Sequence, residues 1–137
     1  MKSPEKKMKE KAWKEFSKWI RRRDLCRSDN GYQPCITCGT VKHYKELQAG
    51  HFIAGRTNAI LFDERGVHAQ CYGCNVGRYG NSVEYFIYME KRYDRDTIDD
   101  LRRLRNTTRK YTLEELEALR DKYADYNVGL DIKLGDI

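Results

Sequence analysis

The chain has 137 residues, of which 39% are hydrophobic and 35% are charged, and its net charge is +6. No apolar run approaches the ~20 residues that a membrane-spanning helix needs, and the N-terminus lacks the apolar segment of a secretory signal. These features exclude a membrane span, favour a cytoplasmic protein with one core and extensions, and favour a polyanionic partner.

The first predicted element is a basic helix over residues 1–24. Ser3 is a suitable N-cap, and Pro4 is tolerated in the first helical turn. Apolar residues then recur at spacings of three and four and form one buried stripe: Met8, Ala12, Phe16, Trp19 and Ile20. Trp13 lies off the centre of this stripe, so we expect it to be partly buried, with stacking on a nucleobase as the alternative.

Lysine and arginine residues crowd the other faces of this helix. The candidates for contacts with DNA near its end are Lys18, Arg21, Arg22 and Arg23. A second basic cluster follows much later in the chain: Arg102, Arg103, Arg105, Arg109 and Lys110. A merely solvated helix face is the alternative for either cluster, but two clusters on both sides of one core favour a nucleic-acid partner.

Residues 25–82 are predicted to form a small metal-stapled core. After a loop over residues 24–34, short strands are expected near 41–44, 47–53, 60–62 and 67–70, with a short helix within residues 71–76. Two C-x-x-C pairs frame this region: Cys35 with Cys38, and Cys71 with Cys74. Each pair places two sulfurs on one tight turn, so together they predict a closed, structural four-thiolate zinc site.

Disulfide bonding is the alternative use of these cysteines. The absence of a secretory signal favours a reducing compartment, where metal binding is the commoner role of paired C-x-x-C motifs. The fifth cysteine, Cys26, belongs to neither pair and needs no partner. Because four thiolates leave zinc no open position for water, the catalytic groups must be sought elsewhere.

His51 and Asn75 are the predicted catalytic residues. With four thiols available for zinc, His51 is free to act as a general base, and small Ala49 and Gly50 leave space beside its ring. Asn75 directly follows the last cysteine, and its amide oxygen suits Mg²⁺ or Mn²⁺, although a plain helix cap is the alternative. Arg56 and Arg78 are candidates for contact with a phosphate.

Residues 83–137 are predicted to form a helical extension. One helix is capped by Asn81 or Ser82, another starts at Asp96, and a capping box of Thr112 and Glu115 opens a third. The tail after Asn127 shows no strong pattern. Apolar faces on these helices make a homodimer interface plausible on sequence grounds alone.

The order of these motifs resembles a known family. The run Cys35, A-G-H51-F, L61-F-D63, V67-H68-A-Q-C71, C74-N75, G80-N81 and Tyr85 is similar to the NinG (Rap) family of lambdoid phage recombination proteins. That family falls within the His-Asn-His (HNH, ββα-metal) nucleases, in the four-cysteine zinc subgroup that includes phage endonuclease VII. The resemblance implies an α+β fold with a zinc-stapled ββα-metal core, and metal-dependent cleavage of branched DNA such as Holliday junctions and D-loops.

The resemblance also assigns roles to residues. It implies that His51 is the general base and that Asn75 holds the catalytic divalent ion, in the cytoplasm of a bacterial host and alongside phage or host recombination proteins. Many superfamily members carry an acidic metal ligand just before the histidine, where this chain has Gly50. The nearest acids that could replace it are Asp63 and Glu64.

A second departure concerns the group that orients the base. The middle asparagine of the superfamily falls near Gly66, so either the Gly66 carbonyl or a side chain such as Asn58 is expected to orient His51. His68, three residues before Cys71, is expected to support the zinc site or to be a hydrogen-bonded core residue. The alternatives to a nuclease are a non-catalytic zinc module that binds DNA or protein, and an accessory protein that bridges recombination partners.

Overall fold

The computed structural model describes the whole chain, residues 1–137, as an α+β protein with two antiparallel two-stranded sheets. The helices are α1 (Pro4–Arg22), α2 (Asn58–Leu61), α3 (Ser82–Arg92), α4 (Arg95–Arg105) and α5 (Leu113–Leu134). The strands are β1 (Tyr32–Pro34), β2 (Val41–His43), β3 (Gln48–His51) and β4 (Val67–Gln70). No helix is both long enough and apolar enough to cross a membrane.

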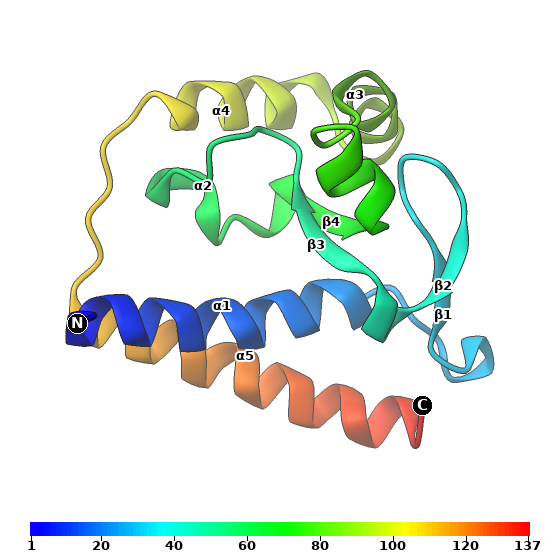
Figure 1. Cartoon of the computed structure of the whole chain (residues 1–137), viewed down its shortest axis with the longest axis horizontal. Helices are drawn as coiled ribbons and strands as arrows, with labels where there is room; N and C mark the ends of the chain where they lie inside the picture. The colour runs from blue at the N-terminus through cyan, green and yellow to red at the C-terminus, as the bar shows by residue number, and fades with distance from the viewer.

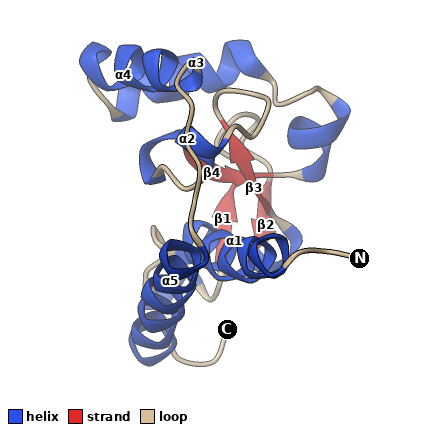
Figure 2. Ribbon diagram, turned by 90° about the vertical axis from the view of Figure 1, so that its left-hand side faces the viewer, coloured by secondary structure: helices blue, strands red, loops and turns tan.

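The β3–β4 sheet lies between two layers of helices. Helices α1 and α5 run parallel and side by side on one side of the molecule, and α3 and α4 lie on the other (Figure 1). The view turned by 90° shows the same order, with the strands between the two layers (Figure 2). The residues on β3 and β4 are therefore enclosed by helices from distant parts of the chain.

The pairing of β3 with β4 decides which residues share a face. Gln48 lies opposite Gln70, and Gly50 lies opposite His68. Because side chains alternate along a strand, these four positions share one face of the sheet. His51 and its partner Val67 belong to the other face, which packs against α1.

The main core forms where α1 and α5 meet this sheet. Phe16 is fully buried, with ring centroids 4.8 Å from Tyr123 and 5.5 Å from Phe62. The eight residues of this core come from the predicted N-terminal helix, central core and C-terminal extension. They are Ala12, Phe16, Ile20, Leu61, Phe62, Val67, Leu116 and Tyr123. The N-terminal and C-terminal helices are thus packed into the core rather than attached to it.

Several predicted elements are confirmed. Ser3 caps α1 by accepting from the backbone N–H of Lys6 at 3.1 Å, and the capping box of Thr112 with Glu115 opens α5. Strand β4 covers the predicted residues, and the expected short helix is a single π-helical turn, Gly73–Gly77. Helix α3 begins at Ser82 after Asn81, as expected.

Other expectations were wrong. The loop over residues 24–34 contains strand β1, and residues 60–62 belong to the end of helix α2 and the residue after it instead of a strand. Helix α4 is capped by Asp94, whose carboxylate accepts from the N–H of Thr97 at 2.8 Å, rather than starting at Asp96. For the tail after Asn127, where the sequence shows no strong pattern, the structure continues helix α5 to Leu134, which packs with Leu25 and Tyr44.

Replacing Phe16 by alanine should destabilise the fold strongly. The substitution removes a fully buried ring from the point where α1, α5 and the sheet meet. We expect a loss of about 3–5 kcal/mol in the free energy of unfolding, measured by urea denaturation followed by circular dichroism. Lys14→Ala, on the exposed face of the same helix, is the matched control and should change stability little. Equal stability of both variants would contradict the proposed core.

Candidate metal centre and catalytic site

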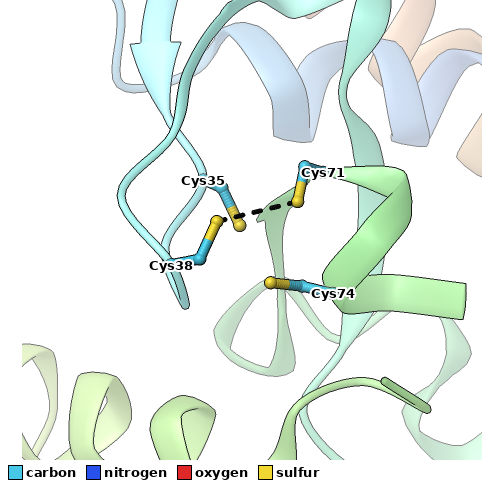
Figure 3. Close-up of side chains that lie close together, drawn as sticks. All are labelled: Cys35, Cys38, Cys71 and Cys74. Atoms are coloured by element: carbon cyan, nitrogen blue, oxygen red, sulfur yellow. Dashed lines mark hydrogen bonds between the residues drawn. The ribbon is translucent and has the colours of Figure 1, made fainter. Parts of the chain in front are cut away.

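Four cysteine sulfurs converge between the two sheets. Cys35 and Cys38 lie in the turn after β1, while Cys71 and Cys74 follow β4. All four Sγ atoms lie within 4.8 Å of one another, and those of Cys38 and Cys71 are 3.7 Å apart (Figure 3). Zinc–sulfur bonds of about 2.3 Å in a tetrahedron require an edge of about 3.8 Å, so this donor set fits zinc. Cys26 is exposed and lies outside the cluster, as expected.

Polar groups around the cluster favour ionised sulfur at Cys35 and Cys38. Burial raises the pKa of Cys35, but hydrogen bonds from Thr37 and from backbone N–H groups outweigh it and bring the pKa down from 9.0 to about 6. The Thr40 side chain lies 3.2 Å from the sulfur of Cys38, and the Asn81 amide donates to the sulfur of Cys74 at 3.6 Å. At Cys71, by contrast, burial raises the pKa from 9.0 to about 11. A thiolate is the form that binds zinc, so Cys35 is prepared for a metal ion, whereas Cys71 would lose its proton on binding one.

His51 ends strand β3, and its ring is held from two directions. Its Nε2 lies 3.2 Å from the carbonyl oxygen of Leu61, and the ring of Trp13 stacks on it with centroids 5.3 Å apart and planes 14° apart. A carbonyl can only accept, so Nε2 carries the proton and Nδ1 keeps a lone pair that no protein group uses. The imidazole is therefore fixed in the tautomer that a general base requires.

The surroundings of His51 also keep it neutral. Burial lowers its pKa from 6.5 to about 4, with the nearby Arg56 guanidinium acting in the same direction. Arg56 itself lies over Trp13, with its guanidinium carbon 4.4 Å from the ring centroid. At neutral pH the ring can accept a proton, whereas a charged imidazolium could not.

The carbonyl that contacts His51 differs from both sequence-based candidates. The Gly66 carbonyl accepts from the backbone N–H of Phe52 at 2.8 Å. The Asn58 side chain contacts Lys9 and donates to the Arg109 carbonyl at 3.1 Å. The sequence pattern missed Leu61 because any residue supplies a backbone carbonyl, and only the fold of the loop places it.

Asn75 lies within the π-helical turn that follows β4. Its amide nitrogen is 2.8 Å from the Oε1 atom of Gln48, which anchors the side chain to the start of β3. Asn75 and His51 form no hydrogen bond with each other, and they stand near the same strand rather than in contact. Asn75 is half-buried, so its amide oxygen is restrained but not sealed from solvent.

The two acids considered as replacements for a carboxylate at Gly50 are engaged elsewhere. Asp63 accepts two hydrogen bonds from the guanidinium of Arg65, at 2.9 and 2.7 Å. Glu64 accepts from the hydroxyl of Tyr123 at 3.2 Å. Apart from the four cysteines, the chain has no group of three or more histidine, cysteine or acidic side chains placed to share a metal ion.

His68 is a hydrogen-bonded core residue, one of the two roles expected for it. Burial lowers its pKa to about 2, so the ring is neutral. The Tyr85 hydroxyl donates to the Gly50 carbonyl at 2.6 Å, so its oxygen must accept from Nδ1–H of His68 at 3.0 Å. Nε2 then accepts from the hydroxyl of Tyr93 at 2.9 Å. This chain of bonds fixes the backbone of β3 next to His51.

Two of the arginines assigned to DNA from the sequence are turned into the protein. Arg22 is buried and donates to the Asn127 carbonyl at 2.9 Å and to the Asp131 carboxylate at 2.7 Å. Arg23 donates to the backbone carbonyl of Glu64, in the turn before β4, and to that of Val67, the first residue of β4. Arg22 is therefore a structural link between α1 and α5, and Arg23 ties α1 to the sheet.

A different group of arginines lies beside His51. A cavity of about 650 Å³ is lined by His51 and Tyr79 together with residues of α4 and the position after it: Asp99, Arg102, Arg103, Arg105 and Asn106. Arg78 is also exposed, one residue before Tyr79. Arg21 donates to the carbonyls of Ser17 and Tyr44, while Lys18 stays partly exposed. The second basic cluster thus approaches the candidate base more closely in this fold than its sequence position indicated.

Comparison with known proteins links the chain to phage proteins. A family model described as "Bacteriophage Lambda NinG protein" matches residues 1–131. The chain is 33% identical to protein ninG of Escherichia phage 933W and 32% identical to protein ninG of Escherichia phage lambda, each over 126 residues and 85% of the chain. It is also 32% identical to protein ninG of Salmonella phage P22 over 126 residues.

The chain spans about 60% of the length of these curated relatives. No solved structure matches it.

Loss of one clustered cysteine should remove zinc and stability together. Cys35→Ser or Cys74→Ser deletes one of four metal ligands, and we expect a loss of about 3 kcal/mol or more, which lowers the melting temperature by about 10 °C. Zinc content measured by mass spectrometry and thermal melting check this result. Cys26→Ser is the matched control and should keep both the metal and the melting temperature. A Cys74→Ser protein that melts normally without zinc would contradict a structural metal.

The imidazole of His51 should not titrate in the folded protein between about pH 5.5 and 7.5, because its pKa of about 4 lies below this range. Ring resonances followed by NMR check this, and in concentrated urea the same ring should titrate near 6.5. Below pH 6.5 the unfolded chain binds a proton that the folded chain excludes, so His51 makes the protein less stable as the pH falls towards 4. A folded-state titration near 6.5 would show that the ring is solvated.

Proposed function

We propose that this chain, which belongs to the NinG family of bacteriophage proteins, is a metal-dependent endonuclease that hydrolyses phosphodiester bonds in branched DNA. The proposal includes its place among the HNH nucleases and a role in phage recombination.

The environment of His51 is the observation that carries this proposal. The ring is neutral, its tautomer is set by the Leu61 carbonyl, its plane is set by Trp13, and Nδ1 has no protein partner. A structural histidine normally uses both nitrogens, as His68 does in this protein. His51 leaves one nitrogen for a water molecule at the wall of a cavity that arginines line.

In the proposed reaction, Nδ1 of His51 accepts a proton from the attacking water, and Leu61 stabilises the imidazolium that results. A divalent ion held by Asn75 would supply charge neutralisation at the phosphate and its leaving oxygen. Arg105, which lines the cavity, and Arg56, which lies over Trp13, would attract the DNA backbone. The neutral state of His51 at physiological pH lets the proton transfer proceed without prior deprotonation of the base.

The distribution of positive charge supports a DNA substrate. The net charge is +6, and three arginines of the α4 region line the cavity beside His51. Two of them are partly neutralised, because Arg102 and Arg103 form ion pairs with Asp99 and Asp100. Contacts of this kind release counterions from DNA, so affinity should fall steeply as salt increases.

Resolution of a four-way junction requires two symmetric cuts, which two copies of the chain would supply. Exposed apolar side chains lie on α3, where Val83 and Ile87 are 71% and 40% exposed. We include a homodimer through this surface in the proposed function.

A non-catalytic zinc module that binds branched DNA is the second candidate function. The observation in its favour is the absence of any acidic cluster around His51 or Asn75. In that case the arginine-lined cavity would bind DNA, and the zinc cluster would serve only as a scaffold. The two candidates differ in whether the chain breaks a phosphodiester bond.

Replacing His51 by alanine should abolish cleavage without abolishing binding. We expect labelled four-way junction DNA to be cut in Mg²⁺ or Mn²⁺ and not in EDTA, and the rate to fall by about 10²–10⁴-fold in His51→Ala. His43→Ala, a histidine in the β2 strand away from this site, is the matched control and should cleave normally.

Gel-based cleavage and binding assays with junction and linear duplex read out both properties. Cleavage by His51→Ala at the normal rate would refute His51 as the base. Tight binding of the junction by the wild-type chain without cleavage in any metal would favour the non-catalytic module.

A further inference from the structure

Gln70 carries a buried oxygen that has no hydrogen-bond donor. The residue is fully buried at the end of β4. Its amide nitrogen lies 2.9 Å from the Gly80 carbonyl and 3.1 Å from the Thr37 hydroxyl. Since a carbonyl can only accept, the nitrogen must face Gly80, and this fixes the orientation of the amide. The oxygen Oε1 then points the other way and is left without a partner.

This oxygen occupies the space that a side chain at position 50 would need. Gly50 and Gln70 share one face of the β3–β4 sheet. A Cβ atom on Gly50 would overlap Gln70 Oε1 and would stand 2.9 Å from the Oδ1 atom of Asn75. The two amide oxygens therefore converge on the place that a side chain at position 50 would occupy.

We propose that Gln70 Oε1 and Asn75 Oδ1 together bind the divalent cation, with Gln70 in place of the acid absent at Gly50. The inference rests on the proposed function and supplies the metal ligand that it lacks. Amide oxygens are suitable ligands for hard cations, and a buried, pre-oriented oxygen loses little freedom on binding. Glycine is required at position 50 because any side chain there would displace this oxygen.

The neutral character of both ligands has a consequence for the order of binding. Two amides bring no negative charge, so the cation gains most of its electrostatic stabilisation from a DNA phosphate. The free protein should bind the cation measurably, and DNA should increase that affinity. Because Oε1 is shielded from solvent, the ion must lose water on that side, and Mn²⁺ should bind more tightly than Mg²⁺, which dehydrates reluctantly.

A hydrogen-bonded chain of the three amides of Gln48, Asn75 and Gln70 is the competing explanation for the close approach of the two oxygens. If the amides of Asn75 and Gln48 were both turned by 180°, Asn75 would donate to Gln70 Oε1 and accept from Gln48. The orphaned oxygen would then have a donor, and no cation would be needed. The two arrangements predict different responses of these amides to a metal ion.

The test is an NMR titration of the zinc-loaded chain with MgCl₂, with glutamine and asparagine side chains labelled with ¹⁵N and with KCl at matched ionic strength as the control. We expect the amide signals of Gln70 and Asn75 to shift together and to saturate at one Mg²⁺ concentration. Gln33, whose amide donates to the Arg21 carbonyl, is the internal reference and should not move. A shift of Asn75 alone, or of neither residue, would overturn the proposal.

Two variants test the same point independently. Gln70→Met removes the oxygen while keeping the size of the side chain, and Gly50→Ala adds a methyl group where the oxygen lies. Each should weaken Mn²⁺ binding, measured by electron paramagnetic resonance, by about 10- to 100-fold. Unchanged Mn²⁺ affinity in Gly50→Ala with normal zinc content would overturn the assignment, even if Gln70→Met fails to fold.

Neither readout requires DNA cleavage. Metal binding at Gln70 and Asn75 in a chain that cuts no DNA would leave this inference standing and would remove the proposed function. Cleavage that survives Gln70→Met with unchanged metal dependence would remove this inference and leave the proposed function standing.

Discussion

The four-cysteine cluster is the constraint on which the rest of the site depends. The apolar cluster around it has only five members, and three of them are the cysteines Cys35, Cys71 and Cys74. So small an apolar cluster gives little stability by burial alone, and a zinc ion bound by the four sulfurs would add the strongest link between the two sheets. The backbone of Ile36 also donates to the Ala69 carbonyl at 3.0 Å, which joins the first cysteine turn to β4. Gln70, Asn75 and the strand that ends in His51 all take their places from this frame.

Helices α1, α3 and α5 position His51 and the end of strand β3. Helix α1 places Trp13 against His51, and the polar link of Arg22 with Asn127 and Asp131 holds α5 alongside α1. Helix α3 contributes Tyr85, which bonds the Gly50 carbonyl and so fixes the end of β3. The imidazole is thereby positioned by parts of the chain that lie far from it in sequence, and this enclosure is also why its pKa is lowered to about 4.

The sequence was sufficient to predict a structural feature wherever the interactions that form it are local. The Ser3 cap, the capping box at Thr112 and the two C-x-x-C pairs each depend on residues within a few positions of one another. It was insufficient where residues far apart in the sequence determine the position of a side chain. In the sequence, Arg22 looks like one of several surface arginines. In the fold it is buried against α5, through hydrogen bonds to Asn127 and Asp131, which lie more than 100 positions away. The sequence cannot show that the backbone carbonyl of Leu61 contacts His51. It also cannot show that Gln70 Oε1 is buried without a hydrogen-bond donor.

Two chemically different metal ions are expected in this protein, one that holds the cysteine frame and one bound at Gln70 and Asn75. Anomalous diffraction from a crystal of the chain with junction DNA and Mn²⁺, recorded at the zinc and manganese edges, distinguishes them. We expect a zinc peak among the four cysteine sulfurs and a separate manganese peak bound by Gln70 Oε1, Asn75 Oδ1 and a DNA phosphate. A manganese peak at Asp63 or Glu64, or a single metal site shared by both edges, would contradict this expectation.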